Sequence, residues 1–339
     1  MNAANKGHQP SRLGLYSLGD RGFESCFLQR GGGPEPRLPG RIEALFAETG
    51  AINGTAAYQP AKYAGRPPAM SIYLDIPHLD RFGWTRIEGA VPVPLCERLV
   101  EILEAEMNVP VHDQSRWHEY GGEPRDFVPI WGHQTQWDIR QHPDFHRIWA
   151  TLWKTDRLGV SLDSCRFTPP WNPGFPEPYG IHWDYDPSDA EKRVFQGVVA
   201  LTDTAANQGG FRCVPSLYHD RDAWSRTPRL DQAGPKNWLA DTEGHEIVHV
   251  PARAGDLILW DSRLPHGNSR NGSSEPRIAF YVMMSPPVEA LRQANVDSWR
   301  TGRCVPWWRN RPGYDRVEPW PPAALTQLGS CLLGLEDWP

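Results

Sequence analysis

The sequence predicts a mainly β domain with a few supporting helices. Five prolines crowd the ten residues before the segment YGIHWDYD (179–186) and exclude a continuous helix there. β-prone runs follow at 247–250, 257–260 and 277–284, separated by a glycine-containing turn and a loop. The clearest helical pattern, at 93–107, places apolar residues on one side and charged residues on the other, which is typical of a helix that packs on a sheet.

Residues 1–69 differ from the rest of the chain. They are punctuated by Gly and Pro, lack sustained periodicity and contain one short helical candidate, 41–48. The phrase GDRGFESCFLQ (19–29) looks like a tRNA gene read as protein, because the GG-TTC-GAA-TCC stretch common in such genes encodes G-F-E-S. We expect translation to begin at Met70 and residues 1–69 to be absent from the native protein. The alternative is a disordered leader.

The remaining chain is predicted to form one domain and one extension. We expect the domain to cover 70–287 and to open with a strand at SIYLDIP (71–77). After residue 287, proline and tryptophan dominate and strand patterns fade. This indicates that 288–339 is a C-terminal extension without a core of its own, whose tryptophans pack across an open end of the domain.

Composition sets limits on function. With 39% hydrophobic residues and no apolar run of about 18, the chain is expected to be globular and not to enter a membrane. Six scattered cysteines and no visible secretory signal favour reduced thiols in the cytoplasm. A net charge of −6 argues against a general nucleic-acid binder, so a small molecule is the expected partner. The oligomeric state stays open.

The segment HWD supplies two candidate metal ligands. His182 and Asp184 are two residues apart, so on an extended strand their side chains share a face. A third candidate, His266, follows two predicted strands and is expected on a loop. Two histidines and one carboxylate on one face of an octahedral metal form the facial triad of non-heme Fe(II) oxygenases, which leaves positions open for other ligands.

An arginine opens the strand that follows His266. Arg277 lies eleven residues after that histidine. A guanidinium pairs with a carboxylate through two parallel hydrogen bonds, which lysine cannot reproduce. An Fe(II) oxygenase needs an electron-donating co-substrate, commonly a dicarboxylate whose 2-oxo acid end chelates iron. Arg277 is therefore the candidate for holding its far carboxylate.

Three further stretches carry a resemblance to a known family. They are DRFGWTRIEGAVPVPLCERLVEILEAEM (80–107), FQGVVALTDTAANQGGFRCVPSLYH (195–219) and GDLILWDSRLPHGNSRN (255–271). Together with HWD and the arginine strand, they resemble the phytanoyl-CoA dioxygenase (PhyH) family of Fe(II)/2-oxoglutarate-dependent oxygenases over residues 79–287. The resemblance implies a double-stranded β-helix (jelly roll) with supporting helices.

The resemblance also implies roles for individual residues. It makes His182, Asp184 and His266 the iron ligands and Arg277 the residue that holds 2-oxoglutarate, with O₂ as the oxidant. Two positions depart from the family pattern. The family's Pro-Gly-Ser-His appears as PSLYH (215–219), and Ala279 stands where relatives in the wider superfamily carry Ser or Thr to share the carboxylate.

The resemblance further implies a reaction. Halogenating relatives replace the triad carboxylate by a small residue, so the intact Asp184 favours hydroxylation of a small organic metabolite, with release of succinate and CO₂. The sequence does not name that metabolite. Candidate substrate-binding residues are Gln134, Gln136, Arg166, Tyr179 and Trp183. Trp183 points opposite to its two neighbours on a strand, so it either packs in the sandwich or lines a pocket.

Three other interpretations remain. HEIVH (245–249) matches the zinc-protease motif, but that chemistry requires a helix, and the segment is β-prone and ends at Pro251. A cupin-like jelly roll has a second motif similar to 255–271, although its first motif usually supplies His-x-His rather than His-x-Asp. A non-catalytic metal-binding jelly roll is the third. The intact Asp184 and Arg277 favour the oxygenase over both jelly-roll alternatives.

Overall fold

Two antiparallel β-sheets form the body of the protein in the computed structural model. The structure describes residues 73–117, 127–173, 178, 180–184, 193–220 and 238–339, so the segment before Met70 lies outside the described residues. In spatial order, the six-stranded sheet contains β1 (Trp84–Ile87), β10 (Leu257–Asp261), β6 (Phe195–Ala200), β12 (Arg277–Tyr281), β4 (Cys165–Thr168) and β2 (Phe127–Val128). The five-stranded sheet contains β8 (Trp238–Leu239), β5 (His182–Trp183), β11 (His266–Asn268), β7 (Phe211–Cys213) and β9 (Val248–His249).

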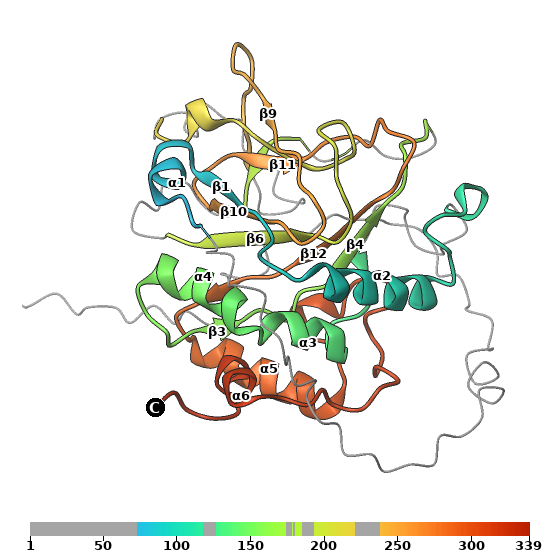
Figure 1. Cartoon of the computed structure of the whole chain (residues 1–339), viewed down its shortest axis with the longest axis vertical. Coiled ribbons are helices and arrows are strands. Elements are labelled where there is room, and N and C mark those ends of the chain that lie inside the picture. Colours follow the sequence, from blue (N-terminus) through green and yellow to red (C-terminus); the bar gives the residue numbers. More distant parts are fainter. Residues whose placement is uncertain (1–72, 118–126, 174–177, 179, 185–192, 221–237) are drawn as a thin grey trace, which may run out of the picture.

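The chain alternates between the two sheets. β4, β6, β10 and β12 belong to the six-stranded sheet, whereas β5, β7 and β11 come between them in sequence and belong to the five-stranded sheet. The five-stranded sheet lies above the six-stranded one in Figure 1, and a two-stranded ribbon of β3 (Gly159–Val160) and β13 (Met284–Ser285) lies near the helices. This alternation confirms the predicted double-stranded jelly roll.

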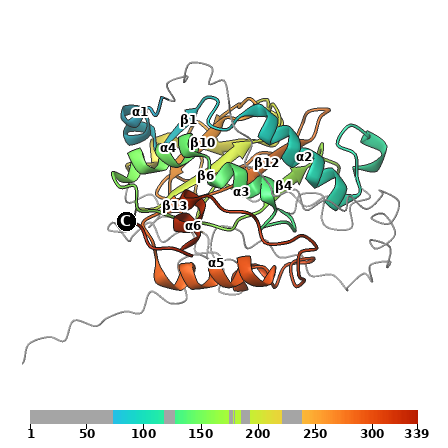
Figure 2. The ribbon, with the colours of Figure 1, turned by 60° about the horizontal axis from the view of Figure 1, so that its bottom comes forward.

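Three helices, α2 (Val93–Met107), α3 (Gln134–Arg140) and α4 (Pro143–Trp153), form a layer along the outer side of the six-stranded sheet (Figure 2). The other helices of the described residues are α1 (Ile76–Phe82), which lies beside β1, and α5 (Glu289–Thr301) and α6 (Gln327–Leu333), with 3-10 turns at Gln114–Arg116, Pro215–Leu217 and Pro306–Trp308. The position predicted for the amphipathic helix matches α2, whose buried residues include Leu95, Leu99 and Leu103. Their spacing places them on one face of the helix.

Strand β6 separates the helical layer from the inner face of the jelly roll. A Cβ placed on Gly197 would lie 2.8 Å from the ring of Trp149 on α4, so only glycine admits this close packing. Because side chains alternate along a strand, Gln196 and Val198 on either side of Gly197 face the opposite way, into the space between the sheets. One face of β6 therefore packs against the helical layer, and its other face lines the space between the two sheets.

Two local predictions were wrong. The strand predicted at 71–77 is not found in the described part of that segment, residues 73–77, because α1 begins at Ile76. The carboxylate of Asp75 accepts a hydrogen bond from the backbone N–H of His78, and Pro77 lies in the first helical turn, where its missing N–H costs nothing. His266 lies on strand β11 rather than on a loop, paired with both β5 and β7.

The C-terminal extension is more ordered than its composition indicated. It contains α5 and α6, which lie on the side of the helical layer away from the sheets (Figure 1). Trp308 packs edge-on against Phe127 of β2 at 5.1 Å between ring centroids, whereas Trp320 packs on His133 and Trp338 on His146. Most of these rings therefore pack on the helical layer instead of crossing an open end of the jelly roll.

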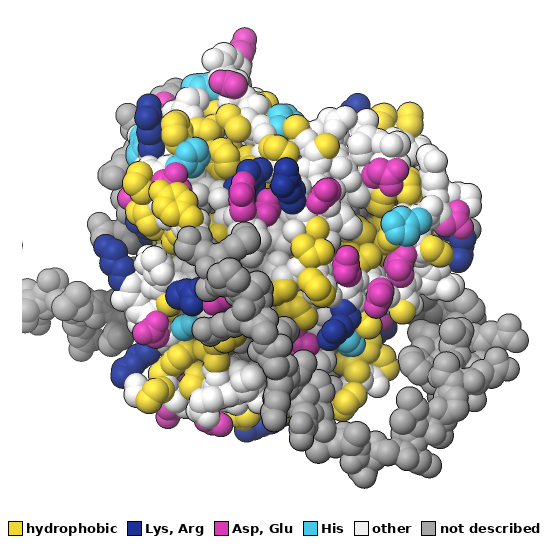
Figure 3. Space-filling view, in the orientation of Figure 1, with side chains coloured by type: hydrophobic (Ala, Val, Ile, Leu, Met, Phe, Trp, Pro, Cys, Tyr) yellow, Lys and Arg dark blue, Asp and Glu magenta, His cyan; other side chains and the backbone are white. Residues whose placement is uncertain are grey.

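Charges of both signs are intermingled on the face shown in Figure 3, among the side chains described there. Long continuous basic stripes are the usual footprint of nucleic-acid binding. The absence of a nucleic-acid partner stays a prediction. In the described part of the chain, no helix has the length and apolar character needed to cross a bilayer.

Glu318 ties the extension to the start of the helical layer. Its buried carboxylate accepts hydrogen bonds from the backbone N–H groups of Trp131, at 2.8 Å, and Gly132, at 3.0 Å. We expect Glu318→Ala to lower the free energy of unfolding by about 2 kcal/mol, because these two backbone N–H groups would lose their hydrogen-bond acceptor. Denaturant unfolding followed by circular dichroism measures this. Glu246→Ala, at an exposed position, is the matched control and should change stability by less than about 0.5 kcal/mol. Equal effects of the two substitutions would contradict the prediction.

Candidate metal centre

Neighbouring strands bring the two histidines together. His182 on β5 and His266 on β11 are direct cross-strand partners, so both side chains project from the same face of the five-stranded sheet. Their ring centroids are 5.1 Å apart. That face points toward the six-stranded sheet, because His266 also contacts Trp260 of β10, at 5.0 Å between ring centroids.

Asp184 completes the cluster. It lies just after β5 and is 2% exposed. One carboxylate oxygen is 3.3 Å from Nε2 of His182, and the other is 3.2 Å from Nε2 of His266. The possible ligand atoms of the three residues all lie within 4.8 Å of one another, which makes them the candidate metal-binding group among the described residues.

The hydrogen bonds of the imidazoles set which ring atoms face Asp184. Nδ1 of His182 is 2.9 Å from the carbonyl oxygen of Gly180, and Nδ1 of His266 is 2.9 Å from that of Leu264. A carbonyl oxygen only accepts, so each Nδ1 carries a hydrogen and donates it. In the neutral ring Nε2 is then an acceptor, as the carboxylate oxygens are. A backbone carbonyl on the far nitrogen is also the usual support of a metal-binding histidine.

This donor set fits a divalent metal. Acceptor atoms that face one another at 3.2 and 3.3 Å require positive charge between them. The spacing is close to the roughly 3 Å expected between neighbouring ligands that each lie about 2.1 Å from one metal ion. When no metal is bound, protons on Nε2 of His182 and His266 can supply this charge. Burial alone would raise the pKa of Asp184, but the hydrogen bonds and charge of these imidazoles then lower it well below its ordinary value. The carboxylate is therefore available as an anion.

A glutamine on β6 orients the carboxylate. Nε2 of Gln196 donates to Oδ2 of Asp184 at 2.7 Å, and Nε1 of Trp260 donates to Oε1 of Gln196 at 3.0 Å. The indole is a donor only, so it fixes which end of the amide faces Asp184. Gln196 and Trp260 are cross-strand partners on β6 and β10. The six-stranded sheet therefore helps to position Asp184, although this residue directly follows β5 of the five-stranded sheet.

Arg277 opens β12 and is 3% exposed. Its Nη1 atom is buried and has no hydrogen-bond partner. Leaving a buried guanidinium nitrogen unsatisfied is costly, so such an atom indicates a place where an anion binds. Arg277 thus opens the strand that follows His266, as the sequence predicted, and its buried guanidinium could hold a carboxylate.

The remaining candidate residues lie in different places. Arg166 on β4 faces the interior as the cross-strand partner of Ala279 on β12. Trp183 points away from the triad, donates from Nε1 to the carbonyl oxygen of Arg263 and packs in a separate small apolar cluster. The structure does not bring Gln134 and Gln136 to the triad, since both lie on α3 in the helical layer. Tyr179 lies outside the described residues.

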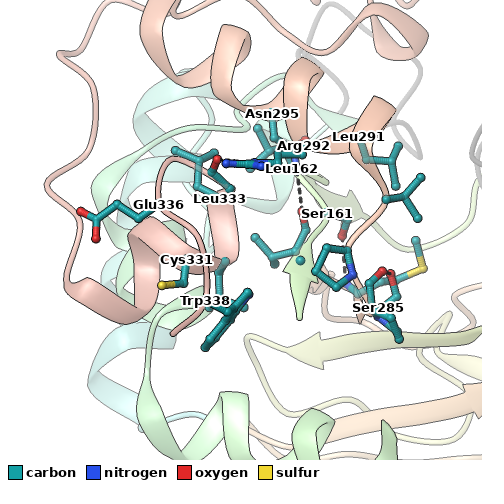
Figure 4. A pocket seen from close by; sticks show the side chains of 18 of the residues that line it. Ser161, Leu162, Ser285, Leu291, Arg292, Asn295, Cys331, Leu333, Glu336 and Trp338 are labelled. Atoms are coloured by element: carbon teal, nitrogen blue, oxygen red, sulfur yellow. Dashed lines mark hydrogen bonds between the residues drawn. The ribbon is translucent and has the colours of Figure 1, made fainter. Parts of the chain in front are cut away.

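The zinc-protease motif does not form a helix. HEIVH contributes only β9 (Val248–His249), and His245 instead contacts the hydroxyl of Ser216 at 2.9 Å. A cavity of about 130 Å³ lies elsewhere, between the β3–β13 ribbon, α5 and α6 (Figure 4). Neither the triad nor Arg277 lines it. The cavity is therefore separate from the candidate metal centre.

Sequence reasoning missed several inner-face residues. Gln196, Asn268 and Tyr281 were not recognised. The signal was present in two cases, because Asn268 is two residues after His266 and Tyr281 is four after Arg277, so the period of two places them on the same faces. For Gln196, the link to Asp184 depends on how the two sheets stack, which no local pattern reveals.

Comparisons with known proteins agree with this geometry. The family model for phytanoyl-CoA dioxygenase (PhyH) matches residues 79–279. The "Putative phytanoyl-CoA dioxygenase" of Dictyostelium discoideum is 22% identical over 257 residues, which cover 61% of this chain and 73% of the relative. The "Ava biosynthesis cluster protein O" of Aspergillus versicolor is 24% identical over 180 residues, covering 47% and 56%.

Among solved structures, the "Putative Oxidoreductase" of Salmonella typhimurium LT2 matches with a TM-score of 0.57 and 17% identity over 76% of this chain and 81% of its own. GlcNAc Inducible Gene 2 of Candida albicans matches with a TM-score of 0.54 and 14% identity, covering 77% and 76%. At these identities the likeness shows the shared fold.

The Gln196 contacts can be tested without a metal. We expect Gln196→Leu to lower the free energy of unfolding of the apoprotein by about 2 kcal/mol, because Asp184 loses a buried donor and Trp260 a buried acceptor. Thermal or urea unfolding measures the change. The control is Gln293→Leu, which removes a glutamine-to-aspartate bond of 3.0 Å on the exposed surface of α5. Its cost should stay below about 0.5 kcal/mol. A loss in Gln196→Leu no larger than this would contradict the prediction.

Proposed function

The chain belongs to the phytanoyl-CoA dioxygenase (PhyH) family, and we propose that it is an Fe(II)- and 2-oxoglutarate-dependent oxygenase that hydroxylates a small organic metabolite. The observation that carries the proposal is the convergence of His182, Asp184 and His266 within 4.8 Å on the inner face of a jelly roll, with a buried arginine on the neighbouring sheet. Succinate and CO₂ are the expected products from the co-substrate.

The triad residues would hold the iron. His182 and His266 would each bind through Nε2, since Nδ1 donates to a backbone carbonyl. Asp184 would bind through its carboxylate while Gln196 holds Oδ2 in place. A metal held by two histidines and one carboxylate would keep positions open for further ligands, and it would supply the oxidising chemistry.

The inner face would exclude water and hold the co-substrate. Trp260 and Phe211 flank His266 at 5.0 and 5.9 Å between ring centroids, so one side of the triad is apolar. Arg277 would pair with the distal carboxylate of 2-oxoglutarate through its partnerless Nη1. The retained Asp184 favours hydroxylation, because a halogenase needs that position vacated for chloride.

Metal binding tests the triad. We expect the purified protein to bind one equivalent of Fe(II) or Mn(II) per chain, and His182→Ala and His266→Ala each to weaken binding at least 100-fold because one of three protein ligands is lost. Anaerobic calorimetric titration with Mn(II) measures this. His245→Ala is the control, because this histidine lies in the zinc-protease motif and should leave the affinity unchanged. Loss of binding in His245→Ala alone would point to that motif instead.

Co-substrate binding tests Arg277. Under anaerobic conditions, Fe(II) and 2-oxoglutarate should produce a visible charge-transfer band, and admission of O₂ should release succinate. We expect Arg277→Met to raise the Kd for 2-oxoglutarate about 100-fold, because the distal carboxylate loses its buried cation. Titration of the band gives the Kd. Arg292→Met, on α5, should leave it unchanged. A band without succinate would indicate a metal site that is idle or non-catalytic under the conditions used.

A further inference from the structure

The inner face of β12 carries a tyrosine in line with Arg277. Side chains two residues apart share a face on a strand, so Arg277, Ala279 and Tyr281 project together toward the five-stranded sheet. Ala279 brings no polar group to this row, and its partner on β6 is Ala200. Position 279 therefore offers no side-chain hydroxyl, and the next polar group along the row is the phenol of Tyr281.

The Tyr281 hydroxyl is held between the two sheets. Nδ2 of Asn268 donates to it at 3.2 Å. Asn268 lies on β11 two residues after His266, on the same inward face as that histidine. The phenol thus joins the strand that carries a metal ligand to the strand that carries Arg277. A co-substrate that reaches from the triad to Arg277 spans the same two strands.

Positive charge surrounds this hydroxyl. Burial alone would raise the pKa of Tyr281, but the guanidinium groups of Arg277 and Arg166 and the bonds from Asn268 and Arg277 lower it below its ordinary value. The pKa shift thus agrees with a hydroxyl that lies beside Arg277. Phe127 packs edge-on against the phenol at 5.2 Å between ring centroids and fixes the ring. A hydroxyl in this setting is suited to donate a hydrogen bond to an anion bound by Arg277.

We propose that Tyr281, positioned by Asn268, is a second binding residue for the distal carboxylate of 2-oxoglutarate and takes the role of the hydroxyl that Ala279 lacks. This inference rests on the proposed function. It explains how a chain with alanine at position 279 could still select a dicarboxylate, because Arg277 and the phenol would meet the same carboxylate from two directions. The hydroxyl hydrogen rotates to suit its acceptor, so the bond from Asn268 can persist.

Binding of two matched 2-oxo acids tests the proposal. 2-Oxopentanoate has the carbon chain of 2-oxoglutarate but lacks the distal carboxylate. We expect Tyr281→Phe to raise the Kd for 2-oxoglutarate about tenfold, because one hydrogen bond to a charged group is lost, and to change that for 2-oxopentanoate less than about twofold. Asn268→Ala removes the donor that positions the phenol. It should raise the Kd for 2-oxoglutarate about threefold and leave that for 2-oxopentanoate unchanged. Calorimetry on the anaerobic Mn(II)-loaded protein measures both ligands without turnover.

Two further variants complete the experiment. Tyr314→Phe is the matched control, because that buried phenol donates to the carbonyl oxygen of Val128 and should not affect either 2-oxo acid. Adding Ala279→Ser to Tyr281→Phe should recover part of the lost affinity for 2-oxoglutarate, by returning a hydroxyl to the row. Equal weakening of both ligands, or no change in folded Tyr281→Phe and Asn268→Ala proteins, would overturn the inference. Failure of the metal-loaded wild-type protein to bind 2-oxoglutarate would instead overturn the proposed function.

Discussion

The candidate metal centre depends on an electrostatically unfavourable arrangement of hydrogen-bond acceptor atoms. Two imidazole nitrogens and a carboxylate point at one another in a buried space, while backbone carbonyls hold the hydrogens of both rings on the opposite nitrogens. Neutral rings so placed would repel the carboxylate, so positive charge must accompany the cluster. The sheet pairing between β5 and β11 enforces the arrangement, since it fixes the two histidines as direct neighbours.

The fold uses strand alternation to keep packing and chemistry apart. On β6, Gly197 meets the indole of Trp149 in the helical layer, and Gln196 beside it reaches Asp184 in the interior. A register shift of one residue would exchange the two faces and bury the amide against α4. Tight packing outside thereby sets the register of the polar residues inside. The helical layer is in this sense part of the site's support, although it contributes none of the triad.

Local patterns in the sequence were sufficient for part of this structure. The period-two spacing of His182 and Asp184, the proline-rich approach and the amphipathic repeat at 93–107 each act over a few residues, and they predicted the mainly β character and the α2 helix. The jelly-roll arrangement was expected only from the family resemblance. The start of α1 was missed because the cap at Asp75 outweighs the β-prone residues before it. The helices after residue 287 were missed because their stability comes from packing on the domain more than from their own periodicity.

The extension also reaches the inner face. Trp308 packs on Phe127, and Phe127 packs on Tyr281, so two ring contacts lead from the C-terminal segment to the row that carries Arg277. Glu318 fixes the same extension to the backbone at Trp131 and Gly132, a few residues beyond β2. These contacts restrain β2, whose Phe127 is the cross-strand partner of Arg166. Aromatic residues that looked like a separate tail in the sequence therefore help to set the position of the polar groups between the two sheets.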